Sequence, residues 1–154
     1  MSKHQSKIPT DFELLTFIYN HYYDDYISFI EKSDQCRDSK IYVPIDCELI
    51  AKYFSVDRDI IFGRLYYHLE NKYGYQRDSN NRVYFYCLSV GKDIKCINFP
   101  YMSSVLADLS DKQSKYITTI KVSLLALFIS LAATSFTVYD HFSNKAPVTI
   151  SNVK

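Results

Sequence analysis

The side chains best spaced for acid–base chemistry are His21, Asp24 and Asp25. On a helix, His21 and Asp25 would share one face, where they could transfer protons or form an ordinary surface ion pair. A nucleophilic cysteine beside His68 would be another arrangement, but no cysteine is close to it in the sequence. The sequence has no Gly-rich phosphate loop, no H-E-x-x-H and no G-x-S-x-G motif. We therefore expect a protein that is not an enzyme and needs no cofactor.

The cysteines and histidines do not have the spacing of a metal site. The four cysteines stand at positions 36, 47, 87 and 96, and the four histidines at 4, 21, 68 and 141. None of these residues forms a C-x-x-C pair or a comparable zinc motif. We predict no metal ligands and interpret the cysteines as small, semi-buried thiols.

Basic side chains recur at a spacing of four in Arg64, His68 and Lys72, which would share one face of a helix. Residues 58–95 hold seven Lys/Arg and four Asp/Glu, a weak positive excess. An ordinary solvated helix face would have the same composition. Residues 1–115 together hold 15 Lys/Arg and 16 Asp/Glu, whereas chains specialised for nucleic acid usually show a basic excess.

The first element that must position these side chains is a helix over residues 11–30. Its apolar residues, at positions 14, 15, 18, 22, 26, 29 and 30, follow a 3.6-residue period. Thr10 is the expected N-cap, and Glu13 would complete a capping box. Residues 41–45 then predict a short strand, which Pro44 restricts to a sheet edge or a strand end.

Two closely spaced helices follow. Asp46 is expected to cap a helix that ends near Ser55, and Asp57 or Asp59 to open another that runs to about residue 72. Gly74 is the C-cap candidate. The residues expected to pack the two helices are Leu49, Ile50, Tyr53, Phe54, Ile61, Leu65 and Leu69. Two short helices after a short strand form a helix-turn-helix pattern.

A β-hairpin is predicted over residues 82–99. Turn-forming residues at 78–81 precede two runs rich in aromatic and β-branched residues, 82–90 and 93–99. Gly91 and Lys92 separate the runs, and glycine in the first loop position is typical of a type II′ turn. This register places Cys87 opposite Cys96, as a packed thiol pair that becomes a disulfide only under oxidation. Pro100 ends the second strand, and a further helix begins at about residue 101.

Residues 122–139, VSLLALFISLAATSFTVY, form 18 consecutive positions without charge, proline or glycine. At about 1.5 Å per residue this run spans roughly 27 Å, close to the hydrocarbon thickness of about 30 Å in a bilayer. A buried core helix is the alternative, but the remaining residues form too small a domain to surround a helix that is apolar on every face. We expect a single transmembrane helix over 117–140.

Flanking lysines predict the orientation of this helix. Lys112, Lys115 and Lys121 precede it, whereas Lys145 and Lys154 follow it. The positive-inside rule then places the N-terminal domain in the cytoplasm and a short tail, 141–154, outside the inner membrane. Small residues recur along one face of the span, where a second copy of the helix could pack to form a homodimer. These residues are Ser123, Ala126, Ser130, Ala133, Thr134 and Thr137.

The order helix, strand, helix, helix, hairpin over about residues 10–100 resembles the winged-helix (winged helix-turn-helix) superfamily. The similar segments are IYVPI, DCELIAKYFSVDRDIIFGRLYYHLENKYGY and RVYFYCLSVGKDIKCINF. The whole chain resembles small bacterial membrane proteins with such a domain before one C-terminal span. The resemblance implies an α+β fold: a flexible N-terminus over 1–10, a winged-helix-like domain with a β-hairpin wing over 11–99, and a connecting helix over 100–116.

In DNA-binding members of this superfamily the third helix enters the major groove and the wing contacts the backbone. The resemblance therefore implies a set of candidate DNA-binding or partner-binding residues: Arg58, Arg64, His68, Lys72, Arg77, Arg82, Lys92 and Lys95. Winged helices also serve as protein-binding modules. The near-neutral charge and the 15 tyrosines favour a membrane-anchored, non-enzymatic module that binds a protein partner or itself. The alternative is a membrane-tethered DNA-binding transcriptional regulator.

Overall fold

The protein is α+β, with small antiparallel sheets and a long C-terminal apolar helix. The computed structural model describes residues 7–29, 37–79 and 81–143. The chain divides into two compact units, Met1–Ser110 and Asp111–Lys154. Most of the predicted flexible N-terminus and external tail, and Cys36, lie outside the described residues.

Helix α1 (Asp11–Ile27) begins at the predicted capping box. The Thr10 hydroxyl accepts a hydrogen bond from the backbone N–H of Glu13 at 3.2 Å, and the Glu13 carboxylate accepts one from the backbone N–H of Thr10 at 2.7 Å. The helix buries Leu14, Leu15 and Ile18 completely, as the 3.6-residue period requires.

The next two helices begin at the predicted caps. The side chain of Asp46 accepts from the backbone N–H of Glu48 at the start of α2 (Cys47–Phe54), and Ser55 ends that helix in the left-handed region at φ 55. Asp57 caps a continuous helical segment, Arg58–Tyr73, here called the third helix. It consists of α3 (Arg58–Gly63), the π-helical η1 (Arg64–Leu69) and α4 (Glu70–Tyr73).

Packing of these helices follows the sequence prediction except at Leu49 and Tyr53. Leu49 is only partly buried and does not belong to the core cluster. Ile50 in α2 and Ile61, Leu65 and Leu69 in the third helix are all fully buried. Tyr53 was expected to pack α2 against the core, but 65% of it is exposed. Tyr53 instead packs its ring against Phe17 of α1, with the centroids 4.2 Å apart and the ring planes tilted by 34°.

The three-stranded sheet has the order β1 (Tyr42–Pro44), β5 (Asp93–Asn98), β4 (Tyr86–Val90), with both pairs antiparallel. Pro44 lies on an edge strand, as predicted. The predicted hairpin register is confirmed: Cys87 faces Cys96, both are free thiols, and Val90 faces Asp93. Gly91 has φ 57, as the first residue of this two-residue loop requires.

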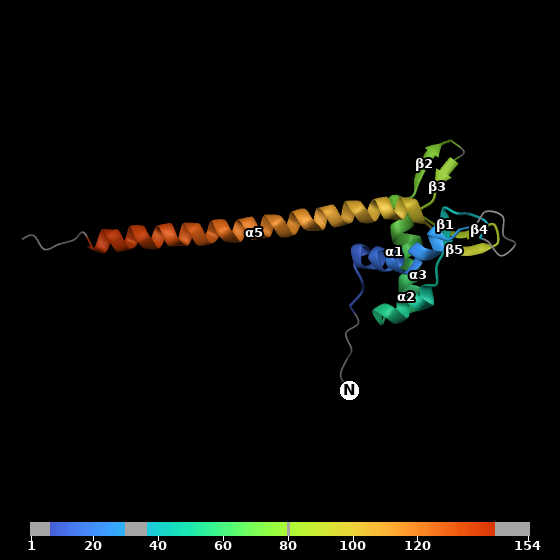
Figure 1. Ribbon diagram of the computed structural model, residues 1–154, viewed down its shortest axis with the longest axis horizontal. Helices are drawn as coiled ribbons and strands as arrows, with labels where there is room; N and C mark the ends of the chain where they lie inside the picture. Colours follow the sequence, from blue (N-terminus) through green and yellow to red (C-terminus); the bar gives the residue numbers. More distant parts are fainter. Residues whose placement is uncertain (1–6, 30–36, 80, 144–154) are drawn as a thin grey trace, which may run out of the picture. The chain divides into compact units, whose positions relative to one another are not determined.

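The predicted single strand over 82–90 is wrong, because the chain breaks at Tyr84 and Phe85. Its first part, β3 (Asn81–Val83), pairs with β2 (Tyr75–Asp78) in a separate hairpin (Figure 1). The turn residues at 78–81 were interpreted as a connection before the strand, so the hairpin formed by β2 and β3 was not predicted. The predicted wing is therefore two hairpins, and Phe99, expected at the end of a strand, begins a helix instead.

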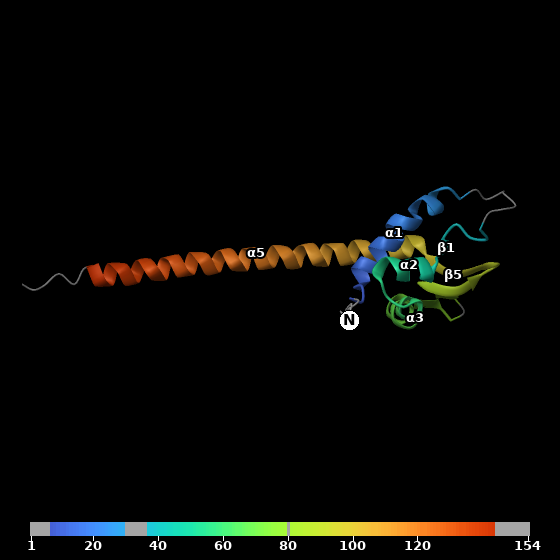
Figure 2. The same ribbon diagram turned by 90° about the horizontal axis from the view of Figure 1, so that it is seen from below.

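That last helix, α5 (Phe99–Ser143), is continuous over 45 residues (Figure 1, Figure 2). Its first turns bury Phe99 and Met102 in the core of the N-terminal unit. Between Phe99 and Tyr139 it is the one helix of the described residues that is long and apolar enough to cross a membrane. Large side chains such as Phe128 and Phe136 are exposed there, and such a surface is stable only against lipid or other apolar groups.

Candidate functional site

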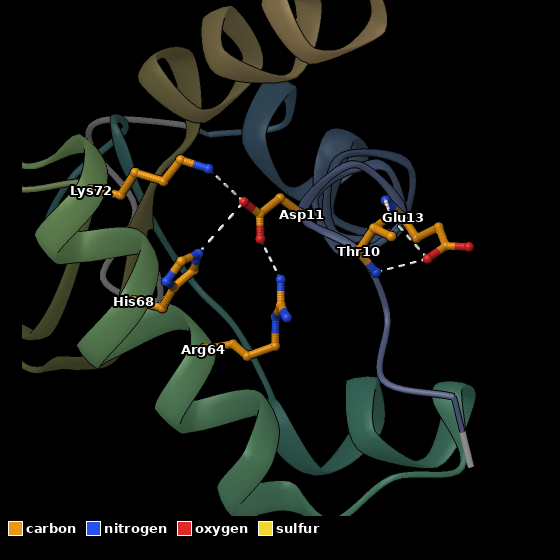
Figure 3. Close-up of polar contacts among 6 residues, drawn as sticks. All are labelled: Thr10, Asp11, Glu13, Arg64, His68 and Lys72. Carbon is orange, nitrogen blue, oxygen red and sulfur yellow. Dashed lines mark hydrogen bonds and ion pairs between the residues drawn. The ribbon is translucent and has the colours of Figure 1, made fainter. Parts of the chain in front are cut away.

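Three of the candidate binding residues meet at one carboxylate. Arg64, His68 and Lys72 extend from one face of the third helix toward Asp11, at the start of α1 (Figure 3). Lys72 Nζ lies 2.8 Å from Asp11 Oδ2, His68 Nε2 lies 3.7 Å from the same oxygen, and Arg64 Nη2 donates to Oδ1. The predicted shared face is therefore confirmed, but it already holds an anion of the protein itself. We call these four residues the Asp11 cluster.

The cluster is partly shielded from water. The side chain of Asp11 is 14% exposed and that of Arg64 24% exposed. Burial by itself raises the pKa of Asp11, but the hydrogen bond from Lys72 and the charges of Lys72, Arg64 and His68 outweigh it, so the pKa is lowered overall. Asp11 is therefore ionised at neutral pH, and its charge is paired with basic side chains of the third helix.

The remaining candidate cations do not join this cluster. Arg58 pairs with its neighbour Asp59, and Lys92 pairs with Asp38 at 3.6 Å beside the β4–β5 loop. Arg77 in β2 and Lys95 in β5 form no ion pair among the described residues. Two hairpins, rather than one wing, thus share the cations predicted for the wing.

Arg82 pairs with the buried carboxylate of Glu70, which the sequence analysis did not identify as a candidate. The side chain of Glu70 is 10% exposed and accepts hydrogen bonds from Arg82 at 3.0 Å. It also accepts from the backbone N–H groups of Phe85 at 2.7 Å and Tyr86 at 2.9 Å. Glu70 therefore holds the break between β3 and β4 against the third helix, because it satisfies two amides that a continuous ladder would have used.

Gly74, four residues after Glu70, is the one weak sequence signal for this arrangement. It follows the third helix as predicted, but its φ is −58, so it does not adopt the left-handed conformation of a typical glycine cap. A Cβ atom there would lie 2.6 Å from the backbone oxygen of Glu70 and would also clash with the carboxylate. Glycine at this position leaves room for Glu70.

The same side of the third helix lines an open groove of about 960 Å³. Its helical wall is formed by Tyr66, Tyr67, Glu70 and Asn71, and its other wall by every residue of β4 from Tyr86 to Val90. Tyr42, Arg82 and Tyr84 complete the lining. Tyr67 is 70% exposed, so a large aromatic surface faces solvent here. We call this the β4 groove.

The acid–base and metal candidates give no comparable site. His21 stacks on Phe17 with ring centroids 5.5 Å apart, and it forms no ion pair with Asp25. Within residues 7–29, 37–79 and 81–143, no three His, Cys, Asp or Glu side chains gather as metal ligands would. Burial raises the pKa of Cys87 to about 12 and that of Cys96 to about 11, so both thiols are protonated at neutral pH.

On the small-residue face of the apolar helix, three hydroxyl groups form hydrogen bonds to backbone carbonyls of the same helix. Ser130 donates to the carbonyl of Leu127 at 2.8 Å, and Thr134 to that of Ser130 at 2.8 Å. Thr137 donates in the same way to Ala133. Because these three hydroxyls are satisfied within the helix, this part of the face is suited to close contact in hydrocarbon.

Comparison of the chain with known protein families, with curated proteins and with solved structures found no match.

Proposed function

We propose that the protein is a single-pass membrane protein whose N-terminal, winged-helix-like domain is a non-enzymatic protein-interaction module at the cytoplasmic face of a bacterial inner membrane. The observation that carries the proposal is the β4 groove, an open, tyrosine-rich surface beside a sheet edge. Aromatic side chains are enriched where proteins bind one another, because they bury much area at little entropic cost.

The apolar helix supports the membrane anchor. Its exposed Leu, Ile and Phe side chains need an apolar environment, and the lysines at 112, 115 and 121 favour an N-terminal domain on the cytoplasmic side. The internally bonded hydroxyls of its small-residue face support packing against a second copy. A membrane anchor also concentrates the domain near partners in the same bilayer, so a modest affinity is sufficient.

A membrane-tethered DNA-binding regulator is the alternative. The order of the helices supports it, as do Arg77 and Lys95, which have no ion-pair partner among the residues that the structure describes. The Asp11 cluster weighs against it, because Arg64, His68 and Lys72 already share a carboxylate. Binding to phosphates would have to replace those contacts, and the affinity would fall accordingly.

Site-specific photo-crosslinking in cells tests the proposal. A benzophenone amino acid at Tyr67, inside the groove, is expected to trap a discrete protein partner or a second copy of the chain. The matched control is the same substitution at Tyr53, which is 65% exposed but lies on α2 away from the groove.

The DNA alternative is tested in parallel on the full chain in lipid nanodiscs. Fluorescence anisotropy of random and genomic duplexes across a salt series is expected to show no binding near physiological ionic strength. Steep salt-dependent binding that is lost on Arg64→Ala with Lys72→Ala, together with no crosslink from position 67, would replace the interaction module with the regulator.

A further inference from the structure

The two edges of the three-stranded sheet differ in how they are protected. The β1 edge is three residues long and contains Pro44, which has no N–H to offer a new strand. The β4 edge is five residues long, Tyr86–Val90, and contains no proline, glycine or charged residue. Proteins usually blunt such an edge with a lysine, a proline or a covering segment.

The β4 groove runs along this unblunted edge. Neighbouring side chains of a strand point to opposite faces of the sheet. A hollow lined by all five residues of β4 therefore includes the edge of the strand, and because Tyr42 of β1 also lines it, the hollow extends over part of the sheet as well. Five residues of strand measure about 17 Å, which is the length of a short extended peptide.

Among the described residues, the backbone on the outer side of β4 is available for hydrogen bonding beyond Tyr86. Tyr86 donates its backbone N–H to Glu70, which closes one end of the edge. Beyond that point, no segment other than β5 hydrogen-bonds to the backbone of Cys87–Val90 within the described part of the chain. Leu88 has no paired residue in β5, unlike its neighbours in β4, and 48% of its side chain is exposed.

The charges of the groove indicate the chemistry of its occupant. Within the described part of the chain, Glu70 and Arg82 are the only charged residues that line it, and they pair with each other at 3.0 Å. The other lining side chains are tyrosines, small polar groups, Leu88 and Val90. The groove therefore offers no net charge to a phosphate or a charged peptide, and it favours an uncharged segment with apolar side chains.

We infer that the β4 groove binds an extended, uncharged peptide segment of a partner protein, which adds to the sheet as a strand beside β4. Backbone hydrogen bonds to Cys87–Val90 supply affinity, and alternate side chains of the peptide pack on Tyr66 and Tyr67 of the third helix. This inference rests on the proposed interaction module and names the form of its partner.

A peptide selection on the full chain in nanodiscs tests strand addition. A phage library of random linear decapeptides is selected on the protein, with empty nanodiscs for counter-selection, and the best binder is synthesised. Hydrogen exchange is expected to show that this peptide slows exchange at the amides of Cys87–Val90. N-methylation of successive peptide bonds is expected to weaken binding at every second position, because only alternate N–H groups of an added strand face β4.

A pair of matched variants locates the site. Leu88→Lys places a charge on the β4 edge and is expected to weaken peptide binding about tenfold or more. Ile41→Lys, beside β1, replaces an equally exposed aliphatic residue (50% against 48%) and is expected to change affinity less than about twofold. Circular dichroism and the urea midpoint of each variant establish that it is folded.

The possible results separate this inference from the proposed function. A peptide that binds equally well to Leu88→Lys, or whose N-methyl effects do not alternate, overturns strand addition. Failure to select any peptide also overturns it. In either case, a protein crosslink from Tyr67 would still support the interaction module, whereas the absence of that crosslink would remove both.

Discussion

The third helix has two faces that differ in what the fold has done with their charges. On one face, the basic side chains of Arg64, His68 and Lys72 converge on Asp11, so a basic stripe becomes an internal cluster around a carboxylate. On the other face, Glu70 and Arg82 neutralise each other below an open surface of tyrosines. A basic pattern in a helix is therefore not necessarily a free basic surface, and the solvent-exposed surface on the groove side carries no net charge.

Glu70→Ala is expected to have the largest effect, because it removes the acceptor for Arg82 and for the amides of Phe85 and Tyr86. Buried donors left without partners should lower the free energy of unfolding by about 3 kcal/mol. Urea unfolding of the full chain in micelles, followed by tyrosine near-ultraviolet circular dichroism, measures this. Glu48→Ala is the control, because its carboxylate pairs only with exposed Lys52 and should cost at most about 0.5 kcal/mol. Equal losses for the two variants would mean that Glu70 does not organise the groove face.

Gly74→Ala tests the packing around Glu70 through a change next to its backbone and carboxylate. The added Cβ would press on the carboxylate and the carbonyl of Glu70, so we expect a loss of about 2 kcal/mol in the free energy of unfolding. Gly63→Ala is the matched control, since a Cβ there would meet only Tyr67 at an ordinary 3.8 Å. If Gly74→Ala were as stable as Gly63→Ala, the close packing of Glu70 against this turn would be refuted.

Asp11→Asn tests the basic face of the third helix, where Arg64, His68 and Lys72 meet the Asp11 carboxylate. It removes the shared carboxylate and should lower the free energy of unfolding by about 1 kcal/mol, because two of its three partners are about half exposed. It should also free the basic face, so that heparin and duplex DNA bind more tightly and with a steeper salt dependence than to the natural chain. Asp59→Asn, which releases only Arg58, is the control. Unchanged polyanion binding would show that these cations are not available even without Asp11.

The smallest expected effect is the pH dependence of the Asp11 cluster. Because the folded-state pKa of Asp11 lies below the ordinary value of 3.8, its contribution is present above that value and is lost as the pH falls through the folded pKa. Glu13 also titrates in this range, because hydrogen bonds from the Thr10 backbone and hydroxyl and from Lys7 lower its pKa to about 2. Both chains contain Glu13, so its contribution cancels in the difference between them. The stability difference between the natural chain and Asp11→Asn should therefore shrink as the pH is lowered from 5 toward about 2. A difference that is constant over this range would contradict the role of the Asp11 charge.

Local signals in the sequence predicted the helix starts and the inner hairpin well. Thr10, Asp46 and Asp57 each cap a helix through bonds that span three residues or fewer. The Gly91–Lys92 loop sets the register of β4 and β5 for the same reason, since a two-residue loop leaves one pairing. The strand over 82–90 failed because its break depends on Glu70, which lies on another element.

The sequence is enough to locate the apolar run over 122–139, the helix N-caps and the hairpin loop, because each depends on composition or on neighbours a few positions apart. Which charged side chains pair with each other depends on the tertiary structure. Asp11 meets Arg64 and Lys72 across separations of 53 and 61 residues, and Glu70 meets Phe85 and Tyr86 across 15 and 16. Such pairings depend on how the elements pack, and no local pattern of charge or hydropathy encodes them.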